Sequence, residues 1–325
     1  MIGAVLAPLI IFGIGALLIT AALSPLETLS WWAGWTEEEI ADETPGADRN
    51  TSERISSSDC YVVYLSGIAS ISGRFLIPRE KAFIKSLKAE MPGAVIIDDV
   101  FPYSPAGLPL LAAPRFFDRL WRRIQKFKLE GRSTMLSILI NLRNVFQVMI
   151  SADHRYGPIY NRGAALVIED ALLRAGYNRD VAAPIVIIGY SGGAQIALGA
   201  ATYLKAQLKA PIDIISIGGV MASEPGLDFV RQLHHLYGDK DTIQKIGAIM
   251  FPERWKVMGH SEWNTAQHEG RIQRHKLDQM LHAGARGYFG LPKVNGVSNN
   301  QRTLKKVVSI LGTSAGSAQK SLQSS

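Results

Sequence analysis

Short apolar runs separated by segments of helical periodicity dominate residues 60–280. Between these runs, residues 78–89, 160–175 and 194–208 carry apolar positions at helical spacing. We therefore expect an α/β fold, a mostly parallel sheet flanked by helices, with functional groups at the carboxyl ends of the strands. The runs, which predict buried strands, lie at 61–65, 94–97, 184–188, 212–217 and 232–237, with a less regular one at 270–277.

The first part of the chain predicts a membrane anchor. Residues 2–23 contain no charged side chain. As a helix they would measure roughly 33 Å, enough to cross bilayer hydrocarbon, so we predict a transmembrane helix at 2–24. A cleaved signal peptide is the alternative, disfavoured by the length of the run and by the absence of Lys or Arg ahead of it. Trp31, Trp32 and Trp35 suit the headgroup level and open a polar linker at 25–58.

The main domain is expected at residues 59–292, with an insertion at 101–159 that breaks the alternation. Residues 115–132 show a basic amphipathic pattern, typical of a membrane interface or of a helix packed on the domain. Residues 135–150 are more apolar, but Asn141, Arg143 and Asn144 argue against a second span. Together the two segments predict a helical cap over the site. Residues 293–325 are expected to form a C-terminal helix and, from about Gly312, a disordered tail.

The composition limits the kinds of binding partner that we expect. The formal net charge of +7 favours anionic surfaces, either nucleic acid or acidic lipid. No zinc-ligand spacing or nucleic-acid-binding motif supports nucleic acid, so we favour a membrane surface. Cys60, the single cysteine, can form neither an intramolecular disulfide nor a metal site alone, and is expected to be a small buried apolar residue.

The strongest chemical signal is the pattern Gly189-x-Ser191-x-Gly193, which joins an apolar run to a helix of small residues. Such a strand-to-helix turn holds its central residue in strained geometry and exposes the hydroxyl, while flanking glycines leave room for the chain to pass itself. The N–H groups that begin the helix, Gly192 first, would face a developing oxyanion. A turn that merely packs tightly or cradles a phosphate is the alternative, but no glycine-rich phosphate motif is present.

At this point the chain resembles the α/β-hydrolase superfamily over roughly residues 60–290. The resemblance implies a nucleophile, an acid and a histidine in that chain order, with Ser191 as the nucleophile. It also implies a second oxyanion donor in the loop after an early strand, here the N–H of Ile68 beside Gly67. This loop departs from the family, since Ser66-Gly67 replaces the usual His-Gly pair.

The acid and the base each have two candidates. A Gly-x-x-Asp turn after the 232–237 run, which the resemblance implies for the acid, selects Asp241, with Asp239 as the rival. For the base, His282 follows the last predicted strand within a glycine-containing loop, and His260 is the runner-up. His268 and His275 also lie downstream of the acid. His234, His235 and His275 are less suited: the first two would lie within a strand, on opposite faces, and serve packing or solvent contact.

These residues predict a serine hydrolase that cleaves an acyl ester, esterase-like or lipase-like, through an acyl-enzyme and without a metal or organic cofactor. Tyr190, beside the nucleophile, and Tyr156, at the end of the insertion, are candidates for substrate contact. The apolar cap favours a hydrophobic acyl group. We expect a single-pass membrane protein with the catalytic domain outside the cytoplasm, although few Lys or Arg fix the orientation. A catalytically silent domain that binds a lipid or protein partner, and an acyltransferase or thioesterase, are the alternatives.

Overall fold

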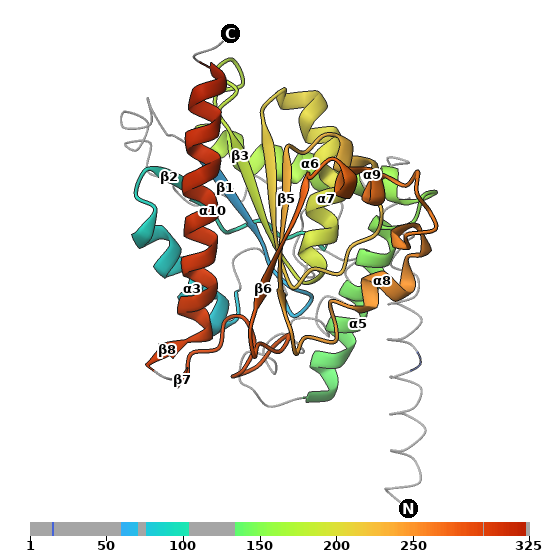
Figure 1. Ribbon diagram of the computed structural model, residues 1–325, viewed down its shortest axis with the longest axis vertical. Helices are drawn as coiled ribbons and strands as arrows, with labels where there is room; N and C mark the ends of the chain where they lie inside the picture. The colour runs from blue at the N-terminus through green and yellow to red at the C-terminus, as the bar shows by residue number, and fades with distance from the viewer. Residues whose placement is uncertain (1–14, 16–59, 71–75, 104–133, 295, 323–325) are drawn as a thin grey trace, which may run out of the picture.

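The computed structural model describes residue 15 and residues 60–70, 76–103, 134–294 and 296–322 (Figure 1). Apart from Gly15, the predicted membrane anchor at 2–24 lies outside these residues, as do the linker at 25–58 and the basic segment at 115–132. Within the described ranges, no helix combines the length and the apolar character needed to cross a membrane.

Six parallel strands form the main sheet of the described chain, in the order β2-β1-β3-β4-β5-β6. The mostly parallel sheet predicted from the apolar runs is thereby confirmed. The irregular run at 270–277 contains β6, which lies at the edge of the sheet and has exposed residues in its middle. The strands are β1 (Cys60–Leu65), β2 (Ala94–Ile97), β3 (Ile185–Tyr190), β4 (Ile212–Ile217), β5 (Gln232–Gly238) and β6 (Ile272–Leu277).

Helices cover both faces of this sheet (Figure 1). One face carries α3 (Pro78–Glu90) and α10 (Asn299–Leu322), which contact each other. The other face carries α5 (Thr134–Ser151), α6 (Gly157–Arg174), α7 (Gly192–Leu208) and α9 (Glu262–His268). The short elements are η3 (Pro225–Asp228), α8 (Ile246–Met250), η4 (Pro252–Arg254), and an antiparallel pair of strands, β7 (Lys293–Val294) and β8 (Val297–Ser298).

The alternation of side chains along each strand divides the core into two layers. In β1, Tyr61, Val63 and Leu65 join the cluster under α5, α6 and α7. The intervening Val62 and Tyr64 join the cluster under α3 and α10. A strand that is buried on both faces needs apolar residues at every position, which is why these segments are continuous apolar runs in the sequence.

The strand order changes direction between β1 and β3. From β1 the chain first adds β2 on one side and then returns to add β3 on the other. The loops that leave these two neighbours run in opposite directions, and ligands of open α/β sheets bind at such a point. The last paired residues are Leu65 and Gly189, so the Ser66–Ile68 loop and Ser191 emerge side by side.

The polar residues that interrupt the apolar stretch at 135–150 anchor α5 to the domain. Arg143 donates a hydrogen bond of 3.1 Å from Nη1 to the backbone oxygen of Tyr103. Asn144 donates from Nδ2 to the backbone oxygens of Ile68 and Ser70, at 2.7 and 2.9 Å. These side chains satisfy loop carbonyls that would otherwise be buried without donors. The helix therefore belongs to the folded domain, while the rest of the predicted cap lies mostly outside the described residues.

The prediction of a disordered tail from about Gly312 differs from the structure, in which α10 continues as a helix to Leu322. Polar and small residues in this stretch suggested disorder, but the helix is nucleated earlier, where Val307, Ile310 and Leu311 are buried against α3 and the sheet. Once the first turns are fixed by packing, adding further turns costs little.

Replacing Leu311 by alanine tests whether α10 is part of the core. Leu311 is fully buried, so we expect Leu311→Ala to lower the free energy of unfolding by about 2–5 kcal/mol. Ser309→Ala is the matched control, because Ser309 lies on the exposed side of the same helix and should change stability by less than about 0.5 kcal/mol. Urea denaturation followed by tryptophan fluorescence measures both; equal effects would show that α10 does not pack as described.

Candidate active site

Ser191 occupies a strained turn between β3 and α7. Its backbone angles, φ 53° and ψ −121°, are rarely adopted by a residue with a side chain. Its N–H donates a hydrogen bond of 3.0 Å to the backbone oxygen of Ile217 in the neighbouring strand. The turn is thus held in place by the sheet.

The two flanking glycines allow the chain to pass itself at this turn. A Cβ at Gly189 would lie 2.4 Å from the Cα of Ala194, and a Cβ at Gly193 would lie 2.6 Å from the backbone oxygen of Leu65. Both neighbours are backbone atoms, which cannot rotate away as a side chain can. The contact at Gly193 also brings the start of α7 against the end of β1, so the turn and the Ser66–Ile68 loop are in direct contact.

A chain of hydrogen bonds links three side chains from three loops. Ser191 Oγ lies 2.9 Å from His282 Nε2, and His282 Nδ1 lies 2.9 Å from Asp241 Oδ2. Ser191 and Asp241 are buried, whereas His282 remains partly exposed. An ionised carboxylate can only accept a hydrogen bond, so the imidazole must carry its proton on Nδ1 and donate it to Asp241. The other ring nitrogen, Nε2, is then free to accept a hydrogen bond from the Ser191 hydroxyl. The structure therefore brings together Ser191, Asp241 and His282.

The rival residues lie elsewhere. Asp239 accepts the N–H of Gln279 at 2.6 Å, and His260 is exposed in the loop before α9. His275 lies 3.1 Å from His234, between β6 and β5. None of these side chains makes a hydrogen bond to Ser191 among the described residues, so the geometry selects Asp241 over Asp239 and His282 over His260.

Asp241 is held ionised by the groups around it. Its Oδ1 accepts the N–H groups of Ile243 and Gln244, at 2.9 and 3.2 Å, and its Oδ2 accepts the hydroxyl of Tyr288 at 2.7 Å. Burial opposes ionisation, but the hydrogen bonds, with that of His282 the largest, outweigh it and lower the pKa of Asp241. The carboxylate is therefore fixed as an acceptor for His282.

Tyr288 is a member of the site that sequence reasoning missed. Besides donating to Asp241, its hydroxyl accepts the N–H of Gly238 at 2.8 Å, so it ties the acid to the end of β5. It lies beyond His282 in the same loop, but nothing in its spacing distinguishes it from the aromatic residues of the core.

The two tyrosines predicted to contact substrate have other surroundings. Tyr190 is buried, its hydroxyl donates to the backbone oxygen of His282 at 2.8 Å, and its ring stacks on the imidazole with centroids 5.7 Å apart. It supports His282 rather than facing an open cleft. Tyr156 lies at the junction of α5 and α6, half exposed beneath the guanidinium of Arg155, and no contact joins it to Ser191 within the described residues.

The groups predicted to stabilise an oxyanion lie beside Ser191. The N–H groups of Gly192 and Gly193 begin α7, where no acceptor exists within the helix. A Cβ at Gly67 would lie 3.6 Å from Ser191 Cβ, and one at Gly192 would lie 3.0 Å from Ile68 Cγ2. The Gly67–Ile68 segment is therefore packed on the turn.

A second serine–histidine contact lies deeper in the sheet. Ser216 Oγ lies 3.0 Å from His235 Nδ1, and His235 Nε2 lies 3.3 Å from Gln244 Oε1. Complete burial lowers the pKa of His235 to about 4, so this imidazole stays neutral. It braces Gln244, whose N–H contacts Asp241. In the part of the chain that the structure describes, no group of three or more His, Cys, Asp or Glu residues could hold a metal ion.

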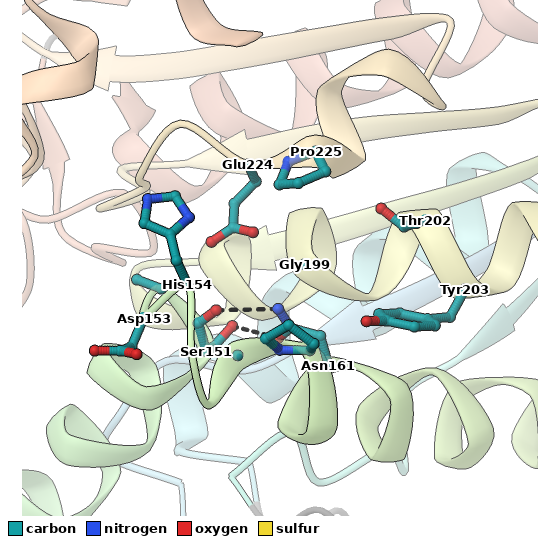
Figure 2. A pocket seen from close by; sticks show the side chains of 12 residues that line it. Ser151, Asp153, His154, Asn161, Gly199, Thr202, Tyr203, Glu224 and Pro225 are labelled. Atoms are coloured by element: carbon teal, nitrogen blue, oxygen red, sulfur yellow. Dashed lines mark hydrogen bonds between the residues drawn. The ribbon is translucent and has the colours of Figure 1, made fainter. Parts of the chain in front are cut away.

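A small cavity of about 100 Å³ opens between the end of α5, α6, α7 and the start of η3 (Figure 2). Its lining does not include Ser191, Asp241 or His282. Figure 2 shows Glu224 directed toward the Ser151–Asn161 side of the cavity. Glu224 accepts a hydrogen bond of 2.6 Å from Gln195, yet burial raises its pKa to about 8. The lining residues are Ser151, Ala152, Asp153, His154, Gly157, Pro158, Asn161, Gly199, Thr202, Tyr203, Glu224 and Pro225.

Comparisons with known proteins give little information about the function of the site. No protein-family model matches the chain, and no curated protein matches it either. Among solved structures, a similar chain is "the putative cell surface hydrolase from Lactobacillus plantarum WCFS1", with 11% identity over 78% of this chain and 89% of that chain, and a TM-score of 0.34. A likeness at this level carries no assignment of function. The fold and site define an α/β protein with a serine, a histidine and an aspartate joined at the carboxyl edge of a parallel sheet.

Replacing Gly189 by alanine tests the tight turn. The new Cβ would meet the backbone of Ala194, so we expect Gly189→Ala to lower the free energy of unfolding by about 1–3 kcal/mol or more. Gly312→Ala is the control, because Gly312 has open space within a helix and alanine there should raise stability by about 0.5–1 kcal/mol. Denaturation in urea compares them; an unchanged midpoint for Gly189→Ala would contradict the packing described.

Glu224 should make stability depend on pH. Its folded pKa is raised above its unfolded value, so the unfolded chain loses this proton first and the protein loses stability as pH rises from about 4.5 to about 8. Glu224→Gln keeps an acceptor for Gln195 and removes the charge. We expect the variant to gain on the order of 3 kcal/mol relative to wild type between pH 5 and pH 9. A difference in unfolding free energy that is the same at both pH values would refute this.

Proposed function

We propose that this protein is a serine hydrolase that cleaves a carboxylic ester through an acyl-enzyme. The observation that carries the proposal is the hydrogen-bonded chain from Ser191 Oγ through His282 to Asp241, at a strained turn beside the N–H groups that begin α7. A serine is a weak nucleophile by itself, and an imidazole held at 2.9 Å is the base that activates it.

The reaction follows from the positions of these groups. Ser191 Oγ attacks the acyl carbonyl while its proton moves to His282 Nε2, and Asp241 stabilises the imidazolium. The N–H groups of Gly192 and Ile68 hold the oxyanion. Collapse of the tetrahedral intermediate breaks the ester bond, and the proton passes from His282 to the leaving alcohol. Water then attacks the acyl-enzyme, with His282 as base, and releases the acid and free Ser191.

The surroundings of Ser191 favour a hydrophobic acyl group. A Cβ at Gly192 would meet Val148 Cγ2 at 2.5 Å and Ile68 Cγ2 at 3.0 Å, so two aliphatic side chains border the oxyanion position. The segment that follows Asp241 also exposes large apolar side chains, among them Ile249, Trp255 and Val257. Together with the apolar residues 2–23, these features support a lipid-like ester at a membrane surface as the substrate.

Labelling with a fluorophosphonate tests the nucleophile directly. We expect wild-type protein in membrane fractions to be labelled, and Ser191→Ala to lose all labelling. His282→Ala should label on the order of 10⁵-fold more slowly, and Asp241→Asn about 10⁴-fold more slowly, because each leaves the hydroxyl without an oriented base. Ser309→Ala, an exposed serine on α10, is the control and should label as wild type does.

Hydrolysis of p-nitrophenyl esters of increasing chain length extends the test to the reaction. The rate should rise from acetyl to longer acyl chains if the aliphatic border contacts the acyl group. Absence of labelling in the folded wild-type protein, or equal labelling of Ser191→Ala, would exclude a serine hydrolase and favour a catalytically silent binding domain. Transfer of the acyl group to an added alcohol in preference to water would identify an acyltransferase instead.

A further inference from the structure

The Ser66–Ser70 loop, which carries the second oxyanion donor, is held by side chains from three different elements. Ser66 O accepts the hydroxyl of Tyr103 at 2.7 Å, and Ile68 O and Ser70 O accept the amide of Asn144. Within the loop, Ser70 N–H donates to Gly67 O at 3.0 Å. Because the N–H and C=O of a trans peptide point in opposite directions, this last bond turns the N–H of Ile68 away from Ser70.

Glu80 supplies the remaining contact of the loop. It lies buried in the first turn of α3, and its carboxylate accepts the hydroxyl of Tyr64 at 2.9 Å. The backbone N–H of Gly67 is the second donor that faces this carboxylate, and it lowers the pKa of Glu80. No cation pairs with it in the described part of the chain. A buried carboxylate without a cation is unfavourable, so its presence directly beneath this loop calls for a role that an apolar residue would not perform.

The hydrogen bonds of the loop indicate what this role is. The Ser66–Gly67 peptide is held at both ends, by Tyr103 at its oxygen and by Glu80 at its nitrogen. The backbone groups from Ser66 O to Ile68 O include two N–H donors. Gly67 N–H faces Glu80, and Ile68 N–H is the one for which the described residues supply no acceptor. That N–H belongs to the residue whose side chain lies against Gly192. The network therefore leaves one donor available, at the position where an oxyanion would form.

We propose that Glu80 is a positioning residue, whose buried carboxylate holds the N–H of Gly67 so that the N–H of Ile68 faces the oxyanion formed at Ser191. This inference rests on the proposed hydrolase function. Glu80 acts through the loop and touches no reacting atom. The departure from the family's His-Gly pair is consistent with this arrangement, since a small loop residue followed by glycine leaves the orientation of the peptide to an external acceptor.

The protonation of Glu80 should be visible in the activity. Burial raises its pKa to about 7, and a protonated carboxyl is a weaker acceptor for the N–H of Gly67. Among the described residues, the titratable groups that face it are Tyr64 from β1, Tyr103 from the loop after β2 and Tyr190 from β3. Burial raises the pKa of each of these phenols, so all three stay neutral and Glu80 is the group that changes charge. Activity should fall as pH decreases through about 7.

Glu80→Gln is the decisive variant, assayed on the full-length protein with a p-nitrophenyl ester. A glutamine keeps the shape but has one accepting oxygen for two donors. We expect kcat to fall roughly 10–100-fold with little change in KM, because a misplaced oxyanion donor affects the transition state and not substrate binding. The acid side of the pH profile should become shallower, because the variant has no titratable group at position 80.

Tyr64→Phe is the companion variant. It leaves Glu80 in place and removes one of its two donors, so the carboxylate is less stabilised and the acid side of the profile should move to higher pH. Urea denaturation establishes that both variants are folded. An active wild type whose Glu80→Gln variant keeps its kcat and its pH profile would overturn this inference alone. A wild type that neither reacts with fluorophosphonate nor hydrolyses any ester would overturn the proposed function as well.

Discussion

The site depends on one steric constraint, the close approach of α7 to the end of β1. Gly193 lies against the backbone oxygens of Leu65 and Ser66 at distances that no side chain permits. This contact places the start of the helix, the strained Ser191 and the loop after β1 in one small volume. Every other member of the site is brought to that volume from a strand end further along the sheet, Asp241 after β5 and His282 after β6.

Much of the fold could be predicted from sequence because its strands are buried on both faces. A mostly apolar run such as 212–217 has few other interpretations in an α/β pattern, and both ends of this fully buried strand were located correctly. The edge strand β6 was less clear, since solvent on one side removes the requirement for apolar residues in its middle. The prediction for the tail differs from the structure for the opposite reason. The polar residues after Gly312 do not indicate that the helical turns before them are buried.

Residues of the candidate site could be predicted where neighbouring residues in the sequence determine their position. They could not be predicted where contacts between distant parts of the chain determine it. The turn at Ser191 can be recognised from five neighbouring residues, and the order of strands limits where Asp241 and His282 can lie. Choosing between Asp241 and Asp239 required coordinates, because both belong to one turn. Tyr288, Asn144 and Glu80 had no local signal. Each acts by a hydrogen bond to a residue distant in sequence, and in the sequence they look like an aromatic core residue, a break in an apolar helix and a charged helix start.

The enclosed carboxyl beneath the Ser66–Ser70 loop places two requirements in opposition. Folding favours the neutral acid, because removing an ionised group from water is costly and no cation compensates for it within the described chain. The proposed role in holding Gly67 favours the anion. The protein is thus more stable when Glu80 is protonated and, if the proposed role holds, more active when Glu80 is ionised. Natural variation at position 80 would therefore be expected to exchange stability for activity, without any change in the three residues proposed to perform the chemistry.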